Sequence, residues 1–303
     1  MIGDAQSPSD FYIDGCDFYS IHRQKKTGFE LPLICPERHY ARKNIGYLIA
    51  MQNGADIIVD TDDDNLPYDT FWHDRVRQQT CRVVDRSGWI NIYRYFTDKN
   101  IWPRGLPLNQ IHAEMPPYES LQAKELDAPI QQGLADEDPD LDAISRLVDS
   151  SRLFFQNKQT NLALAQGVWS PINSQNTTWW KEAFPLLYLP AYCSFRMTDI
   201  WRGFVAQRIA WVNDWHVLFH GPTVRQERNE HNLMRDFTDE LPGYLYNERI
   251  CKELQNLSLE PGTQNLFANL RVCYEKLIAL GVVGERELEL IDAWTNDLKA
   301  IGQ

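Results

Sequence analysis

The 303-residue sequence lacks long apolar runs, strongly basic stretches and paired-cysteine motifs. Without an apolar run of about 18 residues, and without a charged start leading into an apolar stretch, we expect neither a transmembrane helix nor a signal peptide. The six cysteines show no CxxC spacing, so we expect reduced thiols and a cytoplasmic protein. A formal net charge of −12 without a Lys/Arg-rich run predicts no nucleic-acid partner.

Several motifs of common enzyme classes are also missing. The sequence has no GxxxxGK[ST], GxGxxG, GxSxG or HExxH motif, so P-loop, dinucleotide-binding, serine-hydrolase and zinc-protease chemistries find no support. What is present is a composition of 43% hydrophobic and 12% aromatic residues, which is typical of a folded chain. The length suits one large α/β domain with an appendage, or two small domains.

The clearest local pattern is a helix followed by a short strand. Residues 38–54 have apolar side chains at helical spacing and end at Gly54, and residues 55–65 form an apolar strand that breaks into acid. This order predicts an α/β fold. Ligands of open α/β sheets bind beyond the carboxyl ends of the strands, which is where the acidic residues lie.

Other elements are expected on both sides of this unit. Residues 1–4 read as a clipped first strand, because Met1 and Ile2 are the only apolar residues before Gly3 and Asp4. Residues 116–143 read as an exposed acidic crossover. Further predicted strands cover 88–96, 186–195 and 216–224, and a helix covers 198–213.

The pattern changes near residue 237, where apolar residues recur at spacings of three and four. We predict helices over 245–257, 264–280 and 284–301, separated by Pro261-Gly262 and by Gly281–Gly284. We therefore divide the chain into an α/β domain, 1–236, and a helical C-terminal subdomain, 237–303.

The acidic cluster is the strongest chemical signal. Asp60, Asp62, Asp63 and Asp64 fall within five residues, and ionised carboxylates this close repel one another unless a cation binds. Oxygen ligands suit Mn²⁺ or Mg²⁺, and a cation held at a strand end can neutralise a departing diphosphate. The alternative is a solvated acidic turn or a helix cap.

Charged residues at two helix starts are further candidates. Arg42 and Lys43 could meet a pyrophosphate with the help of free backbone N–H groups, or could be ordinary surface charge. Asp199, in the segment TDIWRG, suits a general base for an acceptor hydroxyl, or could be a plain N-cap. Arg202, one turn on, is a candidate to hold substrate.

His220 ends a predicted strand and could complete a metal site with carboxylates, although a lone histidine is more often structural. Loops around Arg104, Asn173 and Gln175 combine aromatic and amide groups of the kind that bind sugars. The run DEDPDLD (136–142) reads as a solvated loop in which a carboxylate could contact a sugar.

Several of these segments together resemble one family. KNIGYLIAMQNGADIIVDTDDDN, NIYRYFTDKNIWPRGLPL, QGLADEDPDLDAISRL, SPINSQNTTWW and FRMTDIWRGFVAQRIAW, followed by FHGPTVRQERNEHN, are similar in order and content to the STELLO-like glycosyltransferases. These proteins are known from the plant Golgi and from nematodes and bacteria. The resemblance covers about residues 1–237, and the C-terminal helices show none. Plant members have a longer, membrane-anchored chain.

The resemblance implies a GT-A fold, a Rossmann-like mixed sheet flanked by helices, with a nucleoside diphosphate-sugar donor and a divalent metal. Asp60-Thr61-Asp62 matches the Asp-x-Asp element, with Asp63 and Asp64 as neighbours. Asp199 matches the acidic residue at a helix start, and His220 matches the metal-binding histidine better than His231. Asp4 closes the first strand, which in such folds helps to hold the nucleotide.

Together these points predict a metal-dependent glycosyltransferase that uses a glycan or lipid-linked acceptor and inverts the anomeric centre. In this hypothesis Asp60 contacts sugar or ribose hydroxyls, and Asp62, Asp64 and His220 hold Mn²⁺ or Mg²⁺. Two rivals remain open, a nucleotide-sugar mutase on the same fold and a non-catalytic scaffold. Peripheral contact with the inner face of a membrane, and the oligomeric state, are also open.

Overall fold

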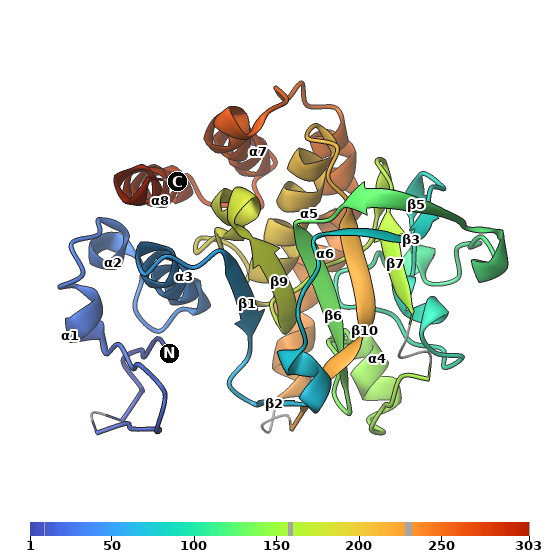
Figure 1. Ribbon diagram of the computed structural model, residues 1–303, viewed down its shortest axis with the longest axis horizontal. Coiled ribbons are helices and arrows are strands. Elements are labelled where there is room, and N and C mark those ends of the chain that lie inside the picture. The colour runs from blue at the N-terminus through green and yellow to red at the C-terminus, as the bar shows by residue number, and fades with distance from the viewer. Residues whose placement is uncertain (9, 157–159, 228–231, 303) are drawn as a thin grey trace.

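A mixed sheet forms the centre of the computed structural model, which describes residues 1–8, 10–156, 160–227 and 232–302 (Figure 1). The sheet has eight strands in the order β1-β9-β6-β10-β7-β3-β5, with β2 paired to β10 off this path. A two-stranded sheet pairs β4 with β8. The strands are β1 (Ile57–Thr61), β2 (Asn65–Pro67), β3 (Gln78–Val84), β4 (Gly88–Trp89), β5 (Gln122–Asp127), β6 (Ile130–Asp136), β7 (Asn161–Leu164), β8 (Val168–Trp169), β9 (Asn176–Trp180) and β10 (Val217–Gln226).

Helices lie against the sheet and beyond its β1 edge. Figure 1 shows α5 and α6 behind the sheet, α7 above it, and α1, α2 and α3 beside β1. This confirms the predicted class, a mixed α/β sheet flanked by helices of the GT-A kind. The helices are α1 (Ile21–Gln24), α2 (Leu31–Ile34), α3 (Lys43–Gln52), α4 (Ala143–Val148), α5 (Thr198–Trp211), α6 (Leu233–Gln255), α7 (Leu266–Ala279) and α8 (Glu287–Ile301).

Strand direction decides where a site can form. Both β1 and β6 pair with β9 antiparallel, and β6 pairs with β10 in parallel, so β1, β6 and β10 all run the same way. Their carboxyl ends therefore meet at one edge of the sheet, where ligands of α/β folds bind. The acidic run after β1 is thereby placed beside the ends of β6 and β10.

The predicted helix and strand before the acidic run are confirmed. Helix α3 buries Ile45, Leu48 and Ile49 on one face, and the chain turns out of it at Gly54. Gly54 has φ +81°, a left-handed conformation that glycine adopts without the penalty of a Cβ atom. Strand β1 then leads directly into the acidic residues.

Three predicted elements are different in the structure. Residues 88–96 form only the short β4 and a 3-10 turn, Ile92–Tyr95. Residues 186–195 form no strand, since a 3-10 helix runs as far as Leu187 and Pro190 interrupts the rest. Residues 116–143, predicted as an exposed crossover, contain β5 and the fully buried β6. The sequence pattern did not indicate β6 because this strand contains the polar residues Gln131 and Gln132.

The N-terminal segment does not add a strand to the large sheet. Ile2 makes a single parallel bridge with Tyr19, so the expectation of a clipped first strand in the sheet is wrong. The Ile2 side chain lies close to Gly46 of α3, where a Cβ atom would approach its Cγ1 to 2.8 Å. Ile2, the apolar residue expected in a first strand, therefore packs on α3 instead.

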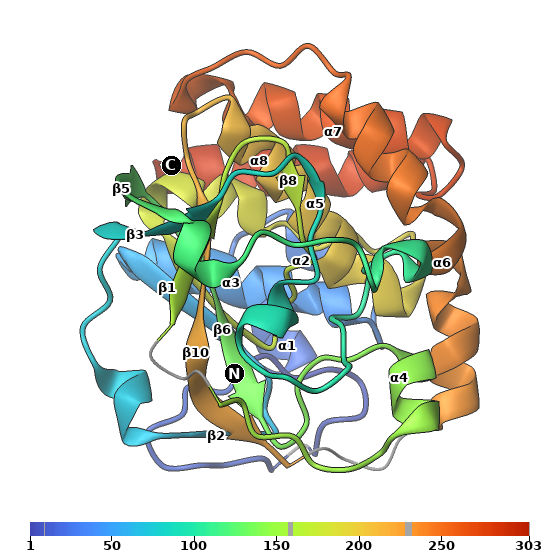
Figure 2. The same ribbon diagram turned by 90° about the vertical axis from the view of Figure 1, so that its right-hand side faces the viewer.

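The three predicted C-terminal helices are confirmed as α6, α7 and α8, although α6 begins at Leu233, well before the predicted start at residue 245. Their buried side chains, among them Leu254, Tyr274 and Trp294, belong to the same hydrophobic cluster as Trp201 of α5. Figure 2 shows α7 and α8 stacked over α5. None of the helices in the described part of the chain is both long and apolar enough to span a bilayer. The six cysteines, all within that part, are unpaired thiols as expected.

Candidate active site

A cavity of about 270 Å³ lies at the edge where β1, β6 and β10 end. Five carboxylates face it, against two guanidinium groups, so its lining is acidic. The residues come from seven separate stretches of the chain, which the strand directions bring together. They are Tyr40, Asp62, Asp63, Asp64, Arg104, Asp140, Ser174, Gln175, Phe195, Arg196, Asp199 and Gln226.

The acidic run after β1 supplies one wall. Asp62 Oδ1 accepts hydrogen bonds from the Tyr40 hydroxyl at 3.2 Å and from Lys43 Nζ at 3.3 Å. Asp64 Oδ1 accepts from Gln226 Nε2 at 2.8 Å. Burial, together with the neighbouring carboxylates, raises the pKa of Asp62 to about 6 against the opposing effect of Lys43. Asp62, Asp63 and Asp64 thus reach the pocket together, as predicted.

Asp60 is not in this wall. Its carboxylate is buried under β1, with Oδ2 2.9 Å from Arg202 Nη1 and Oδ1 2.7 Å from Lys43 Nζ. Arg202 is itself buried, and it also donates to the Asn173 carbonyl. The predicted contacts of Asp60 with sugar hydroxyls and of Arg202 with substrate are therefore wrong, because these side chains neutralise each other inside the fold.

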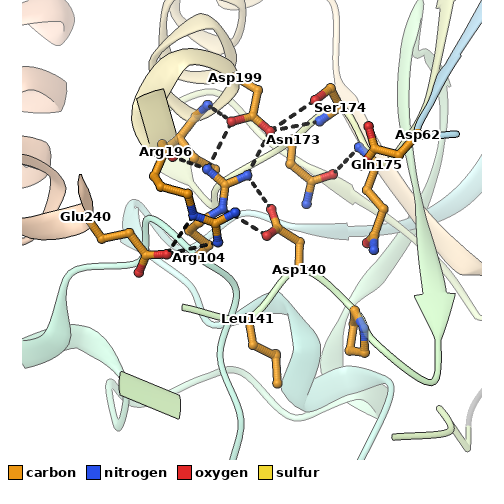
Figure 3. A network of polar contacts seen from close by, with 12 residues as sticks. Asp62, Arg104, Asp140, Leu141, Asn173, Ser174, Gln175, Arg196, Asp199 and Glu240 are labelled. Carbon is orange, nitrogen blue, oxygen red and sulfur yellow. Dashed lines mark hydrogen bonds and ion pairs between the residues drawn. The ribbon is translucent and has the colours of Figure 1, made fainter. Parts of the chain in front are cut away.

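An arginine flanked by two carboxylates forms the opposite wall (Figure 3). Arg104 donates to Asp140 through Nε and Nη2, both at 2.8 Å, and to Asp199 through Nη1 and Nη2, at 3.0 and 2.8 Å. The Ser174 N–H and hydroxyl also donate to Asp199. The prediction places Arg104 correctly at the site, and it is the acidic run 136–142 that supplies Asp140.

The protonation state of Asp199 follows from these bonds. Burial alone raises the pKa of Asp199, but the Arg104 guanidinium outweighs burial and holds that pKa well below its usual range. Asp199 lies in the first turn of α5, as predicted, without capping it. A carboxylate with both oxygens in an ion pair is a weak proton acceptor, which argues against the predicted role as general base.

Of the two basic residues predicted to meet a pyrophosphate, Lys43 alone is near the acidic wall. Arg42 is 2% exposed and donates to Gln24 Oε1 and to the Cys35 carbonyl, away from the pocket. Consecutive residues of a helix point about 100° apart, and here Arg42 turns to the N-terminal segment while Lys43 turns to Asp60 and Asp62. Arg42 holds the N-terminal segment, and the prediction that it contacts a pyrophosphate is not supported.

The amide candidates divide in a similar way. Gln175 lines the pocket and donates to the Asp138 carbonyl and to Gln226 Oε1. Asn173 is buried beneath it, where its Oδ1 accepts from Gln132 Nε2 and from the Gln175 N–H. Asn173 therefore shapes the loop, and its predicted ligand contact is not supported.

Asp4 has a local structural task. Its two oxygens accept from the N–H groups of Arg38 and His39 at 2.7 and 2.8 Å. This fixes the loop that leads to Tyr40, which does line the pocket. Asp4 itself is not among the pocket residues, so the predicted contact with the nucleotide is not supported.

His220 is not at a strand end. Strand β10 continues through an irregularity between His220 and Val224 as far as Gln226, because Gly221-Pro222 bends the strand without ending it. The His220 Nδ1 lies 2.8 Å from the Gly221 carbonyl, and the ring is absent from the pocket lining. Gln226 occupies the strand end instead. His231 lies outside the described residues.

The metal prediction has no complete protein cage behind it. Across the described ranges, no group of three or more His, Cys, Asp or Glu side chains is arranged to hold an ion.

The sequence analysis missed five of the residues that line the pocket, which are Tyr40, Ser174, Phe195, Arg196 and Gln226. Phe195 and Arg196 stand just before the TDIWRG segment, within the stretch FRMTDIWRGFVAQRIAW, and their position there was the signal that could have pointed to them.

Comparison with known proteins shows a similarity to one family of glycosyltransferases. Residues 196–303 match the family model described as STELLO glycosyltransferases, which includes the C-terminal helices where the sequence had suggested no resemblance. The chain is 29% identical to the probable glycosyltransferase STELLO1 and 28% identical to STELLO2, both from Arabidopsis thaliana. Each alignment covers 99% of this chain and 41% of the relative, so the chain spans about two fifths of their length. By these comparisons the chain is similar to the STELLO glycosyltransferases along nearly its whole length.

Proposed function

We propose that this chain is a metal-dependent glycosyltransferase that moves a sugar from a nucleoside diphosphate-sugar to the hydroxyl of a glycan or lipid-linked acceptor. One observation carries the proposal. A single pocket joins three clustered carboxylates after β1 to a second pair of carboxylates that Arg104 holds in place. The first group suits a cation and diphosphate, and the second suits sugar hydroxyls.

The donor set fits Mg²⁺ or Mn²⁺. Mg²⁺ is commonly bound by one or two carboxylates together with substrate phosphates and water, so a three-residue protein cage is not required. Asp62, with Asp63 or Asp64 beside it, offers carboxylate oxygens to the cavity, and no arginine among the described residues pairs with these three. When bound, a divalent cation would balance the charge of the leaving diphosphate.

The rest of the pocket has the chemistry to hold a sugar. Asp140 and Asp199 both lie beside Arg104, and carboxylate oxygens accept hydrogen bonds from hydroxyl groups. Lys43 reaches Asp62 from the start of α3 and limits repulsion within the acidic wall. An inverting displacement through Asp199 would require that carboxylate to leave Arg104 before it could take a proton.

Calorimetry with nucleoside diphosphates tests the proposal. Wild-type protein should bind at least one of UDP, GDP and ADP in the presence of Mn²⁺, and much more weakly after chelation. Asp62→Asn should lose the binding that depends on Mn²⁺. Asp56→Asn is the matched control, because Asp56 lies just before β1 with an 84% exposed side chain outside the pocket.

The two rival functions give other results. A scaffold binds neither Mn²⁺ nor a nucleoside diphosphate, and that result would refute the proposal. A mutase converts the donor sugar to a ring isomer with no acceptor present, which nuclear magnetic resonance of the incubated donor detects. A transferase gives slow hydrolysis of the donor alone and transfer when an acceptor is added, and the anomeric signal of the product gives the stereochemistry.

A further inference from the structure

Phe195 is an exposed aromatic ring in a pocket of charged groups. It is 51% exposed, although it lines the cavity beside Arg196 and Asp199. Its ring meets those of His39 and Tyr40 edge-on, with centroids 6.2 and 6.1 Å apart. The ring thus has two aromatic neighbours, while about half of the residue's surface stays open to solvent.

The backbone that carries Phe195 is held on both sides. The Ser194 hydroxyl donates to the Asp239 carbonyl, and Arg104 donates to the Arg196 carbonyl. Phe195 begins a short 3-10 turn, Phe195–Met197, that runs directly into the buried helix α5. An apolar ring is therefore presented to the cavity from a fixed position, and this is the arrangement that a stacking surface needs.

The cations around this ring are already paired. Arg104 is used by Asp140 and Asp199, and Arg196 donates through Nε and Nη2 to Glu240, which is fully buried. Lys43 is used by Asp60 and Asp62. In the described lining, then, no cation is left for a second anionic ligand, and the carboxylates repel one.

We propose that Phe195 is the stacking surface for a neutral sugar ring of the acceptor, and this rests on the proposed function. The apolar face of a pyranose packs on an aromatic ring, while its hydroxyls donate to Asp140 or Asp63 at the same cavity. An acceptor with a uronate or a phosphate on that ring is disfavoured. The ligand class at this subsite is an uncharged glycan unit.

Ligand-observed nuclear magnetic resonance tests this inference without any transfer reaction. The probes are methyl glucopyranoside, galactopyranoside and mannopyranoside, together with methyl glucuronide, which differs from the glucoside at C6 alone. Mg²⁺ replaces Mn²⁺ to avoid paramagnetic broadening, and the titrations are run with and without UDP, GDP or ADP. The variants are Phe195→Ala, Phe195→Trp and Phe154→Ala, the last a matched control because Phe154 is 52% exposed and outside the pocket.

We expect at least one neutral pyranoside to bind wild-type protein, with the glucuronide binding more weakly than the glucoside. Phe195→Ala should weaken that neutral binding by about fivefold, Phe195→Trp should retain it, and Phe154→Ala should not change it. Binding of the glucuronide equal to or tighter than that of the glucoside overturns the inference. So does binding by Phe195→Ala equal to wild type, or binding of no pyranoside at all.

The nucleobase of the donor is the other planar group that an aromatic ring could stack. If Phe195→Ala weakens nucleoside diphosphate binding as much as pyranoside binding, the ring belongs to the donor and the inference fails. The test of the stacking role can be told apart from the test of the proposed function. If wild-type protein binds no nucleoside diphosphate, the transferase is refuted, whereas the pyranoside titrations can refute only the stacking role of Phe195.

Discussion

Arg196, in the wall of the pocket, is bonded to Glu240, a buried carboxylate on helix α6 (Figure 3). Glu240 Oε1 lies 3.1 Å from Arg196 Nε and 2.9 Å from Nη2. Glu240 Oε2 also accepts from the Ala143 N–H at 2.8 Å and from the Tyr244 hydroxyl at 2.7 Å. One residue of the C-terminal helices thus holds the turn before α5 and the start of α4, which follows the loop of Asp140.

This relationship predicts that Glu240→Gln alters the pocket as well as the stability of the fold. The Gln amide can accept only at its oxygen, so either Arg196 or Ala143 loses its partner, and we expect unfolding to become easier by about 2 kcal/mol. Freed Arg196 should react faster with an arginine-selective dicarbonyl reagent, as measured by mass spectrometry of its peptide.

The control is Asp297→Asn. Asp297 of α8 accepts from the N–H groups of Glu30 and Leu31, so it is a similar buried anchor at a place away from the pocket. We expect it to lower stability without changing the reactivity of Arg196. Equal reactivity of Arg196 in wild type and Glu240→Gln would show that Glu240 has no hold on the pocket.

Asp60 should matter for stability in a way that other members of the acidic run do not. Asp60→Asn leaves Arg202 and Lys43 with an uncharged partner, and breaking a buried ion pair costs about 3–5 kcal/mol. Asp63→Asn, at the exposed middle of the run, should change the free energy of unfolding by less than about 0.5 kcal/mol. Urea denaturation of both variants at pH 7 measures the contrast, and similar midpoints would contradict it.

The elements around the acidic run could be predicted because their signals are local. Helical periodicity, Gly54 and the apolar Ile57–Val59 run all lie within about twenty residues of one another. Strand β6 could not be predicted in this way. Its Gln131 and Gln132 look like surface residues, but they are buried because their amides find partners in Val76, Ala128 and Asn173 from distant segments.

The site shows the same division. Sequence pattern placed Asp62, Asp64, Arg104, Gln175 and Asp199 at one site, and the structure brings them to one cavity. It could not tell which charged residues are free to meet a ligand. Arg42, Asp60 and Arg202 are residue types common in binding sites, but their side chains bond to other buried groups of the fold. The sequence alone does not show these pairings.

Binding of the cation and nucleotide should weaken in mild acid. The pKa of Asp62 is raised to about 6, chiefly by burial, so this carboxylate becomes protonated as the pH falls through that value. A protonated Asp62 no longer attracts a cation, and we expect the affinity for nucleoside diphosphate with Mn²⁺ to fall about tenfold per unit below pH 6. Calorimetry from pH 5 to 8 measures it, and a flat profile down to pH 5 would rule out Asp62 as a ligand.

Asp199 gives the sharpest test of mechanism against structure. If its role is to hold Arg104, Asp199→Asn should make unfolding easier by about 2 kcal/mol at pH 7, because a buried charge loses half of its partners. The pKa of Asp199 is depressed in the folded state, so its stabilising effect is present above its usual pKa near 4 and is lost in stronger acid. The stability difference between wild type and Asp199→Asn should therefore shrink below pH 4.

The kinetic prediction separates this role from that of a base. A general base contributes about 10²–10⁴-fold to turnover, and it leaves an acidic limb in the pH profile at its pKa. With Asp199 ionised throughout, the wild-type turnover profile between pH 5 and 9 should contain no limb that Asp199→Asn removes. If such a limb exists and disappears in the variant while stability is unchanged, Asp199 leaves Arg104 during the reaction and the predicted base is restored.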